Sequence, residues 1–201
     1  DTDRSRGLGD VYKRQMEQYL KFSKIVRSIY LRYSPEVESF GIDESWIELT
    51  GSPLLQQKTP LEIANEIRTT VKEEVGLTVS IGVSFNKIFA KLGSDMKKPD
   101  AVTVITRESF KDQIWPLPVS DLLYVGRATT EKLRLYGIRT IGDLAQADRA
   151  MLIHRLGVNG EKLWVFANGL DQSRVMPCDY EIPIKSVGHG LSLIHISEPT
   201  R

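Results

Sequence analysis

Apolar residues recur at intervals of three and four positions in several segments of the chain, which is the spacing of one helix face. The first such segment is residues 16–33, and Ser34-Pro35 ends it because the residue before proline is pushed out of the helical region. A second helix is predicted to begin after Thr59, where a proline and the glutamate of a capping box follow. The pattern predicts two further helices, over residues 87–96 and from Thr106 to about Ile114.

Other segments alternate apolar with polar side chains, which is the pattern of a half-buried strand. Residues 37–42 and 46–49 are predicted to form a strand pair, and residues 77–85 and 101–105 two further strands. Small side chains within residues 77–85 would let a helix approach the sheet closely. The alternating order of helices and strands predicts a mixed α/β layer with helices covering one face of the sheet.

The character of the chain changes at Trp115-Pro116-Leu117-Pro118, which reads as a stiff linker. Residues 16–115 before it form the α/β domain, whereas residues 116–170 contain only short helices and are predicted to form a second, all-helical domain. Residues 171–184, with their prolines and acids, are predicted to be a second linker. Residues 185–191 look like the beginning of another domain.

The two ends of the chain, residues 1–15 and 192–201, do not follow the pattern of the rest. The first has no clear periodicity and no cap signal, so it is expected to be an artefactual or disordered tail. Both ends resemble translated sequencing-adapter read-through; a genuine flexible terminus is the alternative. Neither end is expected to carry function.

Composition limits the possible classes of function. The net charge of +1 is nearly neutral, so any affinity for nucleic acid has to come from local patches. The single cysteine, Cys178, excludes an internal disulfide and a cysteine-built zinc site. No apolar run approaches the roughly 20 residues that span a bilayer. A cytoplasmic protein without a membrane partner is therefore expected.

Asp43 and Glu44 are adjacent acids at the junction of the first predicted strand pair. Neighbouring side chains of a regular strand point to opposite faces, but at a hairpin tip or bulge both carboxylates can reach one point. Such a pair repels unless a proton or a divalent cation lies between the two groups. The alternative is an ordinary solvated turn.

The helical domain contains two similar connections, Val125-Gly126-Arg127 and Leu156-Gly157-Val158, each followed by Glu-Lys-Leu a few residues later. A short helix, a glycine turn and a second helix form a helix-hairpin-helix pattern, in which the free amides of the second helix face a phosphate. Such contacts with the DNA backbone read no sequence. Ordinary helical hairpins with a glycine stop remain the alternative.

Three stretches together carry a family resemblance: residues 40–49 (FGIDESWIEL), residues 81–99 (IGVSFNKIFAKLGSDMKKP) and residues 117–145. In order and spacing they resemble the Y-family, or translesion, DNA polymerases, and within that family the DinB type. The resemblance extends from about Met16 to Gly190. It implies an α+β fold: a partial palm with a mixed, mostly antiparallel sheet covered by helices, then a small helix-hairpin-helix thumb, with residues 185–191 beginning the little finger.

The resemblance implies template-directed nucleotidyl transfer, in which a primer 3′ hydroxyl attacks the α-phosphate of a dNTP with two Mg²⁺ ions. Asp43 would bridge both ions, and Glu44 would help hold the ion that activates the primer hydroxyl. Lys98 would contact the β- and γ-phosphates, with Asp95 and Lys91 flanking that site. Without the resemblance, Lys98 would read as a solvated helix end.

The resemblance also implies partners: primer-template DNA, dNTP and a sliding clamp bound through a further C-terminal region, the polymerase itself being a monomer. The residues expected to hold the DNA backbone lie at the two glycine turns: Val125, Gly126, Arg127, Thr129, Thr130, Gly157, Asn159 and Gly160.

The chain departs from the family because the N-terminal acidic motif, which supplies a third carboxylate, and most of the fingers are not in it. As written, it is expected to bind DNA weakly and to polymerise nothing. A rival interpretation is a non-catalytic DNA-binding module that uses its two helix-hairpin-helix units. A third is a generic α/β domain in which Asp43 and Glu44 are only turn residues.

Overall fold

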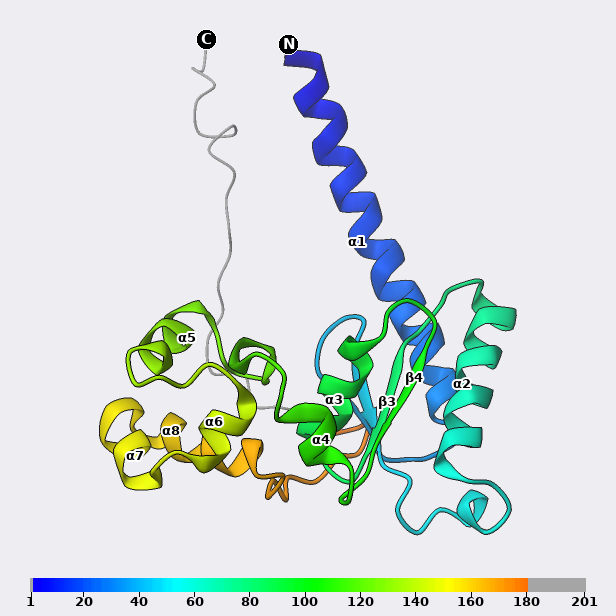
Figure 1. Cartoon of the computed structure of the whole chain (residues 1–201). Helices are drawn as coiled ribbons and strands as arrows, with labels where there is room; N and C mark the ends of the chain where they lie inside the picture. Colours follow the sequence, from blue (N-terminus) through cyan, green and yellow to red (C-terminus); the bar gives the residue numbers. More distant parts are fainter. Residues whose placement is uncertain (1, 181–201) are drawn as a thin grey trace.

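The computed structural model describes residues 2–180, with side chains from residue 16 onward (Figure 1). The expectations for residues 181–184 of the second linker, for residues 185–191 and for residues 192–201 lie outside the described part. In chain order the elements are α1 (Thr2–Tyr30), β1 (Val37–Ser39), β2 (Ser45–Ile47), η1 (Pro53–Gln56), α2 (Pro60–Val75), β3 (Ile81–Ser84), α3 (Lys87–Met96), β4 (Val102–Ile105), α4 (Phe110–Ile114), η2 (Val119–Asp121), α5 (Arg127–Arg134), α6 (Ile141–Gln146), α7 (Arg149–Leu156) and α8 (Val158–Ala167).

Helix α1 is longer than the sequence pattern predicted, because its backbone is helical from Thr2 instead of from Met16. The sequence predicted an artefactual or disordered tail over residues 1–15, whereas the backbone is helical from Thr2; the artefactual origin of these residues stays a prediction. A helix that is already nucleated gains one hydrogen bond for each residue it adds, and no proline interrupts residues 2–30. The C-terminal part of α1 packs on α2: Ile29 is fully buried in a cluster with Ile63, Ile67 and Val71.

Helix α2 follows its local signals closely. The Thr59 hydroxyl accepts a hydrogen bond from the Glu62 amide, and the Glu62 carboxylate accepts one from the Thr59 amide, which completes the predicted capping box. Gly76 ends the helix in a left-handed conformation with φ of 73°. Helix α4 differs from its prediction: it begins at Phe110, because Thr106 and Ser109 exchange hydrogen bonds in a turn before it.

The strands form two separate pairs, and only one of them is antiparallel. Strands β1 and β2 pair antiparallel with Ser39 opposite Ser45, whereas β3 and β4 pair parallel with Ile81 opposite Val102. The chain between β3 and β4 contains α3, and such a crossover brings the second strand back in the same direction. The α+β class is confirmed, but within the described residues the sheet is not mostly antiparallel.

Helices cover both faces of the β3–β4 pair rather than one. Ile81 of β3 packs with the α1–α2 cluster, while the neighbouring Gly82 lies against the backbone of α3. Figure 1 shows α2 on one side of these strands and α3 on the other. Because successive residues of a strand point to opposite faces, one short strand holds two helices in place.

The chain turns at the expected domain boundary, residues 115/116, but the hydrophobic core is continuous across it. One hydrophobic cluster contains Phe89 and Ile105 of the α/β part together with Leu133, Leu152 and Leu163 of the helical part. The Trp115 indole donates a hydrogen bond to Ala167 O at 3.2 Å, which ties the expected linker to the end of α8. The helical part and α3 are thus packed together, and the division into two domains stays a prediction.

Helices α7 and α8 form the second of the two predicted helix-hairpin-helix units. Helices α7 and α8 meet at Gly157, which has φ of 63°, a conformation that favours glycine. In the first unit, the leading element is only the single 3₁₀ turn η2. In the part of the chain that the structure describes, no helix has the length and apolar character needed to span a bilayer.

Burial at the end of α1 gives folding stability a dependence on alkaline pH. It raises the pKa of Tyr30 from its ordinary value of 10.0 to about 12. Because the folded-state pKa is the higher one, this contribution is complete below pH 10 and is lost as the pH rises toward 12. We expect the free energy of unfolding to fall over this range by on the order of 2 kcal/mol.

Urea titrations of the wild type and of Tyr30→Phe at several alkaline pH values test this expectation. The phenylalanine variant should lose less stability between pH 10 and 12, whereas Tyr19→Phe, at a side chain that is 56% exposed, should behave like the wild type. Equal losses in all three proteins would contradict the assignment.

Candidate metal and nucleic-acid site

Asp43 and Glu44 lie in the tight turn between β1 and β2, as the sequence predicted. The amides of Phe40 and Gly41 both donate to the Glu44 carbonyl, at 3.0 and 3.4 Å, and close the turn. The Phe40 ring packs on Trp46 of β2 with ring centroids 4.7 Å apart, which fixes the base of the turn. Asp43 is exposed and Glu44 is half-buried, so the two carboxylates are presented at the tip of a rigid hairpin.

Helix α3 presents two lysines, one helical turn apart, to this hairpin. The Lys87 ammonium is 2.6 Å from a carboxylate oxygen of Glu38 on β1, and the Lys91 ammonium is 3.0 Å from Glu44 at the tip. Residues four apart lie on the same side of a helix, so the spacing alone aims both ammonium groups the same way. The second lysine therefore holds one of the two candidate metal ligands.

A chain of alternating charges runs from the hairpin tip along α3. Lys91 also contacts Asp95 at 2.5 Å, and Asp95 in turn contacts Lys98 at 2.7 Å. Glu44 is thereby linked through Lys91 and Asp95 to Lys98, whose side chain is 58% exposed. The structure brings four of the five predicted metal and nucleotide residues together in this way, and Asp43 adjoins the first of them.

The charged side chains of this series, from Glu44 to Lys98, stabilise one another in their ionised forms. Burial raises the pKa of Asp95, but hydrogen bonds from Lys91 and Lys98 outweigh burial and hold that pKa below its usual range. Burial lowers the pKa of Lys91, but its bonds to Asp95 and Glu44 outweigh it and leave that pKa raised. At neutral pH the carboxylate and the ammonium are both charged, and Lys91 is engaged by two acids rather than free to bind phosphate.

The donor set at the hairpin tip suits a hard cation. Mg²⁺ is commonly held by one or two carboxylates together with water and substrate phosphates, and Asp43 and Glu44 supply two carboxylates. Among the residues that the structure describes, no group of three or more His, Cys, Asp or Glu side chains could enclose a metal ion. The pair therefore fits a metal that is shared with a phosphate-bearing substrate and does not fit a closed protein site.

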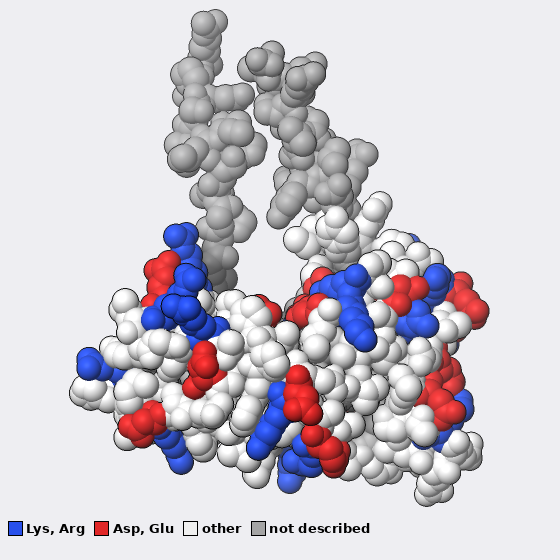
Figure 2. All heavy atoms as spheres, viewed as in Figure 1, with Lys and Arg blue, Asp and Glu red and all other residues white. Residues whose placement is uncertain are grey.

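The helical part presents backbone amides at the beginning of α5. Gly126 caps this helix without a side-chain bond, and the first backbone hydrogen bond of α5 runs from the Thr130 amide to Gly126 O. The amides of residues 127–129 thus have the geometry of an anion site at a helix start. The Arg127 side chain is 93% exposed beside them. Figure 2 shows Lys and Arg side chains gathered over the region of α5, with acids among them.

Other residues predicted to contact DNA have structural roles. Val125 is buried in the core, and the Thr130 hydroxyl donates to Gly126 O at 3.1 Å. Gly160 lies against α7: its amide donates to Gly157 O, and an added Cβ would be 2.1 Å from Leu152 O. We therefore attribute Gly160 to helix packing. Of the second turn, Gly157 and Asn159 are exposed, and Thr129 of the first is half-buried.

Comparison with known proteins identifies the family. The impB/mucB/samB family matches residues 9–95, which includes part of the segment predicted to be a tail, and the IMS family HHH motif matches residues 107–138. DNA polymerase IV of Acetivibrio thermocellus is 55% identical over 182 residues, which is 90% of this chain and 45% of that protein. DNA polymerase IV 1 of Bacillus subtilis is 39% identical over 181 residues, 90% of this chain and 43% of that protein.

Solved structures show the same fold. DinB from Sulfolobus solfataricus has a TM-score of 0.71 at 23% identity, over 80% of this chain and 47% of that one. An insertion ternary complex of Dbh DNA polymerase has a TM-score of 0.72 with the same identity and coverage. The chain spans less than half the length of these relatives. With both family segments present in the expected order, the chain belongs to the impB/mucB/samB family, the Y-family of DNA polymerases.

Proposed function

We propose that this chain supplies the palm and thumb portion of a DNA-directed DNA polymerase that carries out translesion synthesis. The observation that carries the proposal is the linked series of charges from the Asp43-Glu44 turn through Lys91 and Asp95 to Lys98. A carboxylate pair for metal at the hairpin turn and an exposed lysine just beyond the C-terminal end of α3 are the two features that a triphosphate substrate requires. The family and the relatives support this assignment.

Each member of the series has a role in that reaction. Asp43 and Glu44 would hold Mg²⁺, which lowers the pKa of the primer hydroxyl and stabilises charge on the leaving pyrophosphate. Lys98 would bind the β- and γ-phosphates of a dNTP as a mobile point charge. Lys91 and Asp95 would keep Glu44 and Lys98 oriented between turnovers.

Primer-template DNA would bind at the helical part through its backbone phosphates. The amides at the start of α5, with Arg127 beside them, would take one phosphate, and the exposed turn at Gly157 and Asn159 would take another. Such contacts position the duplex without reading its sequence, as a polymerase that copies any template requires.

A chimera tests the proposed function directly. Residues 16–180 of this chain would replace the matching segment of the A. thermocellus DNA polymerase IV, and primer extension would be measured with and without Mg²⁺. We expect metal-dependent extension by the chimera and none by residues 16–180 alone, in which the structure describes two acids at the site. A folded chimera that binds DNA but extends no primer would favour a non-catalytic DNA-binding module instead.

Replacement of Arg127 by alanine tests the phosphate contact at α5. We expect weaker binding to duplexes of every sequence, and a decrease of about 1 in the slope of log affinity against log salt. Fluorescence anisotropy with labelled duplexes at several salt concentrations measures both quantities. Arg32→Ala, which breaks the exposed Arg32–Glu74 pair, is the matched control and should leave the slope unchanged. Equal slopes for Arg127→Ala and the wild type would show that Arg127 does not contact a DNA phosphate.

A further inference from the structure

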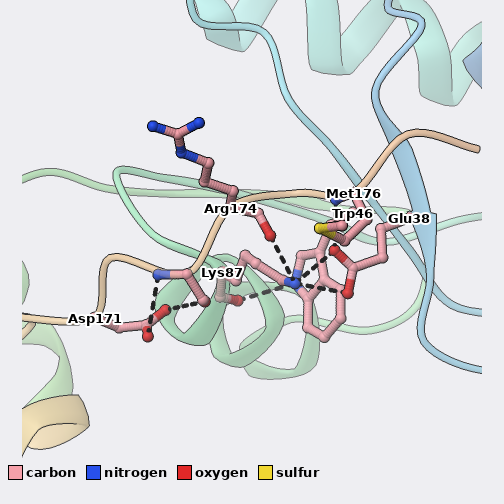
Figure 3. Close-up of polar contacts among 7 residues, drawn as sticks. Glu38, Trp46, Lys87, Asp171, Arg174 and Met176 are labelled. Carbon is pink, nitrogen blue, oxygen red and sulfur yellow. Dashed lines mark hydrogen bonds and ion pairs between the residues drawn. The ribbon is translucent and has the colours of Figure 1, made fainter. Parts of the chain in front are cut away.

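The segment that follows α8 returns to the α/β part and lies against it (Figures 1 and 3). We call residues 171–176 the strap. Just before the strap, Asn86 of the palm donates to Gly169 O at 3.4 Å, and near the end of the strap Val175 is buried, with 9% of its surface exposed. The expected linker is thus seated on the palm over these residues.

The strap meets a shielded ion pair between the hairpin and α3. The Lys87 ammonium lies 2.7 and 2.6 Å from the two carboxylate oxygens of Glu38, and their side chains are 12% and 21% exposed. The ammonium is also 4.4 Å from the centre of the Trp46 ring, whose indole N–H donates to Lys87 O at 3.0 Å. Shielding from water strengthens such a pair and makes its geometry more specific.

Backbone groups of the strap bond to both members of this pair. The Lys87 ammonium donates to Arg174 O at 3.3 Å, and the Met176 amide donates to Glu38 Oε2 at 2.8 Å (Figure 3). Each contact pairs a charged group with a main-chain group, which makes it stronger than a neutral hydrogen bond. The position of the strap backbone is therefore tied to Glu38 and Lys87 whatever its side chains are.

The same pair sets the position of the acid-bearing turn. Glu38 belongs to β1, whose partner strand carries Trp46, two residues after Glu44. From adjacent turns of α3, Lys87 contacts Glu38 within β1 and Lys91 contacts Glu44 in the turn. A shift of Glu38 relative to α3 would therefore also move the turn at Asp43-Glu44.

We propose that Glu38 and Lys87 are positioning residues that couple the strap to the metal-binding hairpin. When the strap is seated, its backbone completes the hydrogen bonds of the pair, and the pair holds the carboxylates of Asp43 and Glu44 in place. When the strap is released, the hairpin loosens and metal is held less well. The coupling to metal rests on the proposed function, whereas the coupling between strap and hairpin does not.

Amide hydrogen exchange on the chain itself tests the mechanical part. In Glu38→Gln, we expect exchange of the Met176 amide and of the Phe40 and Gly41 amides to accelerate together, on the order of 10-fold. Glu74→Gln, which weakens the exposed pair with Arg32 on the far side of α2, is the matched control and should leave all three amides unchanged. Acceleration at Met176 without any change in the turn would overturn the coupling, and so would no change at Met176.

Metal dependence in the chimera tests the functional part. Met176→Pro removes the strap's donor without altering the palm, and Gln172→Pro is the control, since its amide makes no hydrogen bond within the described residues. For Met176→Pro we expect the Mg²⁺ concentration at half-maximal extension to rise on the order of 10-fold, as is usual when a residue supporting a metal ligand is lost. The rate at saturating Mg²⁺ should stay within about 2-fold of the unmodified chimera, since metal affinity and not chemistry is affected.

The outcomes of the two experiments are separable. An unchanged Mg²⁺ half-saturation in Met176→Pro would overturn the link from strap to metal. Lys87→Arg, which keeps a charge and several donors, should retain more metal affinity than Lys87→Met; equal losses in both would indicate packing rather than positioning. If the chimera extends no primer at all, the proposed function fails, and hydrogen exchange still decides whether strap and hairpin are coupled.

Discussion

Asp43→Asn in the chimera should abolish primer extension while leaving DNA binding unchanged. Asparagine keeps the size of the side chain but removes the charge that would hold Mg²⁺, and a catalytic metal contributes several kcal/mol to transition-state stabilisation. A loss of about 4 kcal/mol corresponds to a decrease of about 10³-fold in the extension rate. Single-turnover extension at saturating DNA and dNTP measures this rate.

The matched control for Asp43→Asn is Glu36→Gln, which removes an exposed carboxylate just before β1, at the opposite end of the hairpin from the acid turn. Its extension rate should stay close to that of the unmodified chimera. An Asp43→Asn chimera that extends primers at the unmodified rate would show that these acids are ordinary turn residues.

Gly82→Ala should destabilise the fold strongly. A Cβ at this position would lie 1.9 Å from Ala90 O and 2.6 Å from the Ser94 amide, both of them backbone atoms of α3. Backbone atoms cannot move away without shifting the helix, so we expect a loss of about 1–3 kcal/mol or more in the free energy of unfolding. Chemical denaturation followed by circular dichroism measures this loss.

The control for this substitution is Gly41→Ala, where the nearest atom to an added Cβ is an Asp43 carboxylate oxygen at 3.8 Å. Its effect should remain within about 0.5 kcal/mol, as for other surface substitutions. Equal stability of Gly82→Ala and the wild type would mean that α3 does not pack on β3 as closely as the structure has it. In that case the placement of Lys91 beside Glu44 would also be in doubt.

Features set by neighbours in the sequence were predictable. The capping box at Thr59 and Glu62 needs only residues three positions apart, and the structure confirms it. The turn at Asp43-Glu44 was predicted because the acids interrupt two alternating segments, and the strands flank it on both sides. Lys87 and Lys91 point the same way because of helix geometry alone.

Features set by distant contacts were not predictable from the pattern. The parallel pairing of β3 with β4 and the two-sided cover of that pair depend on how helices pack, which alternation does not encode. The hydrogen bonds that the Glu38 carboxylate accepts from the Lys87 ammonium and the Met176 amide join residues 49 and 138 positions apart. In the sequence, Glu38 was recognisable only as a polar position of a predicted strand, and no neighbouring residue indicated its ion-pair or hydrogen-bond partner.

At the candidate site, two predicted residues make tertiary contacts that their sequence motifs did not indicate. Lys91 was expected beside the nucleotide, but its ammonium lies between Glu44 and Asp95. Gly160 was expected to contact DNA, but it allows the close contact of α8 with α7. In both cases a tertiary neighbour that the local motif does not encode contacts the residue, and its role in binding stays a prediction.

The most direct test of the account is where a divalent cation binds on this chain. Paramagnetic Mn²⁺ added in small amounts broadens the NMR signals of the amides nearest to it, even when binding is weak. In the wild type we expect the amide signals of residues 40–45 to broaden first. In Asp43→Asn the same signals should stay sharp at the same Mn²⁺ concentration. Broadening centred instead on Asp95 and Asp121, which line a cavity of about 470 Å³ between α3 and η2, would contradict the assignment of the metal to the hairpin.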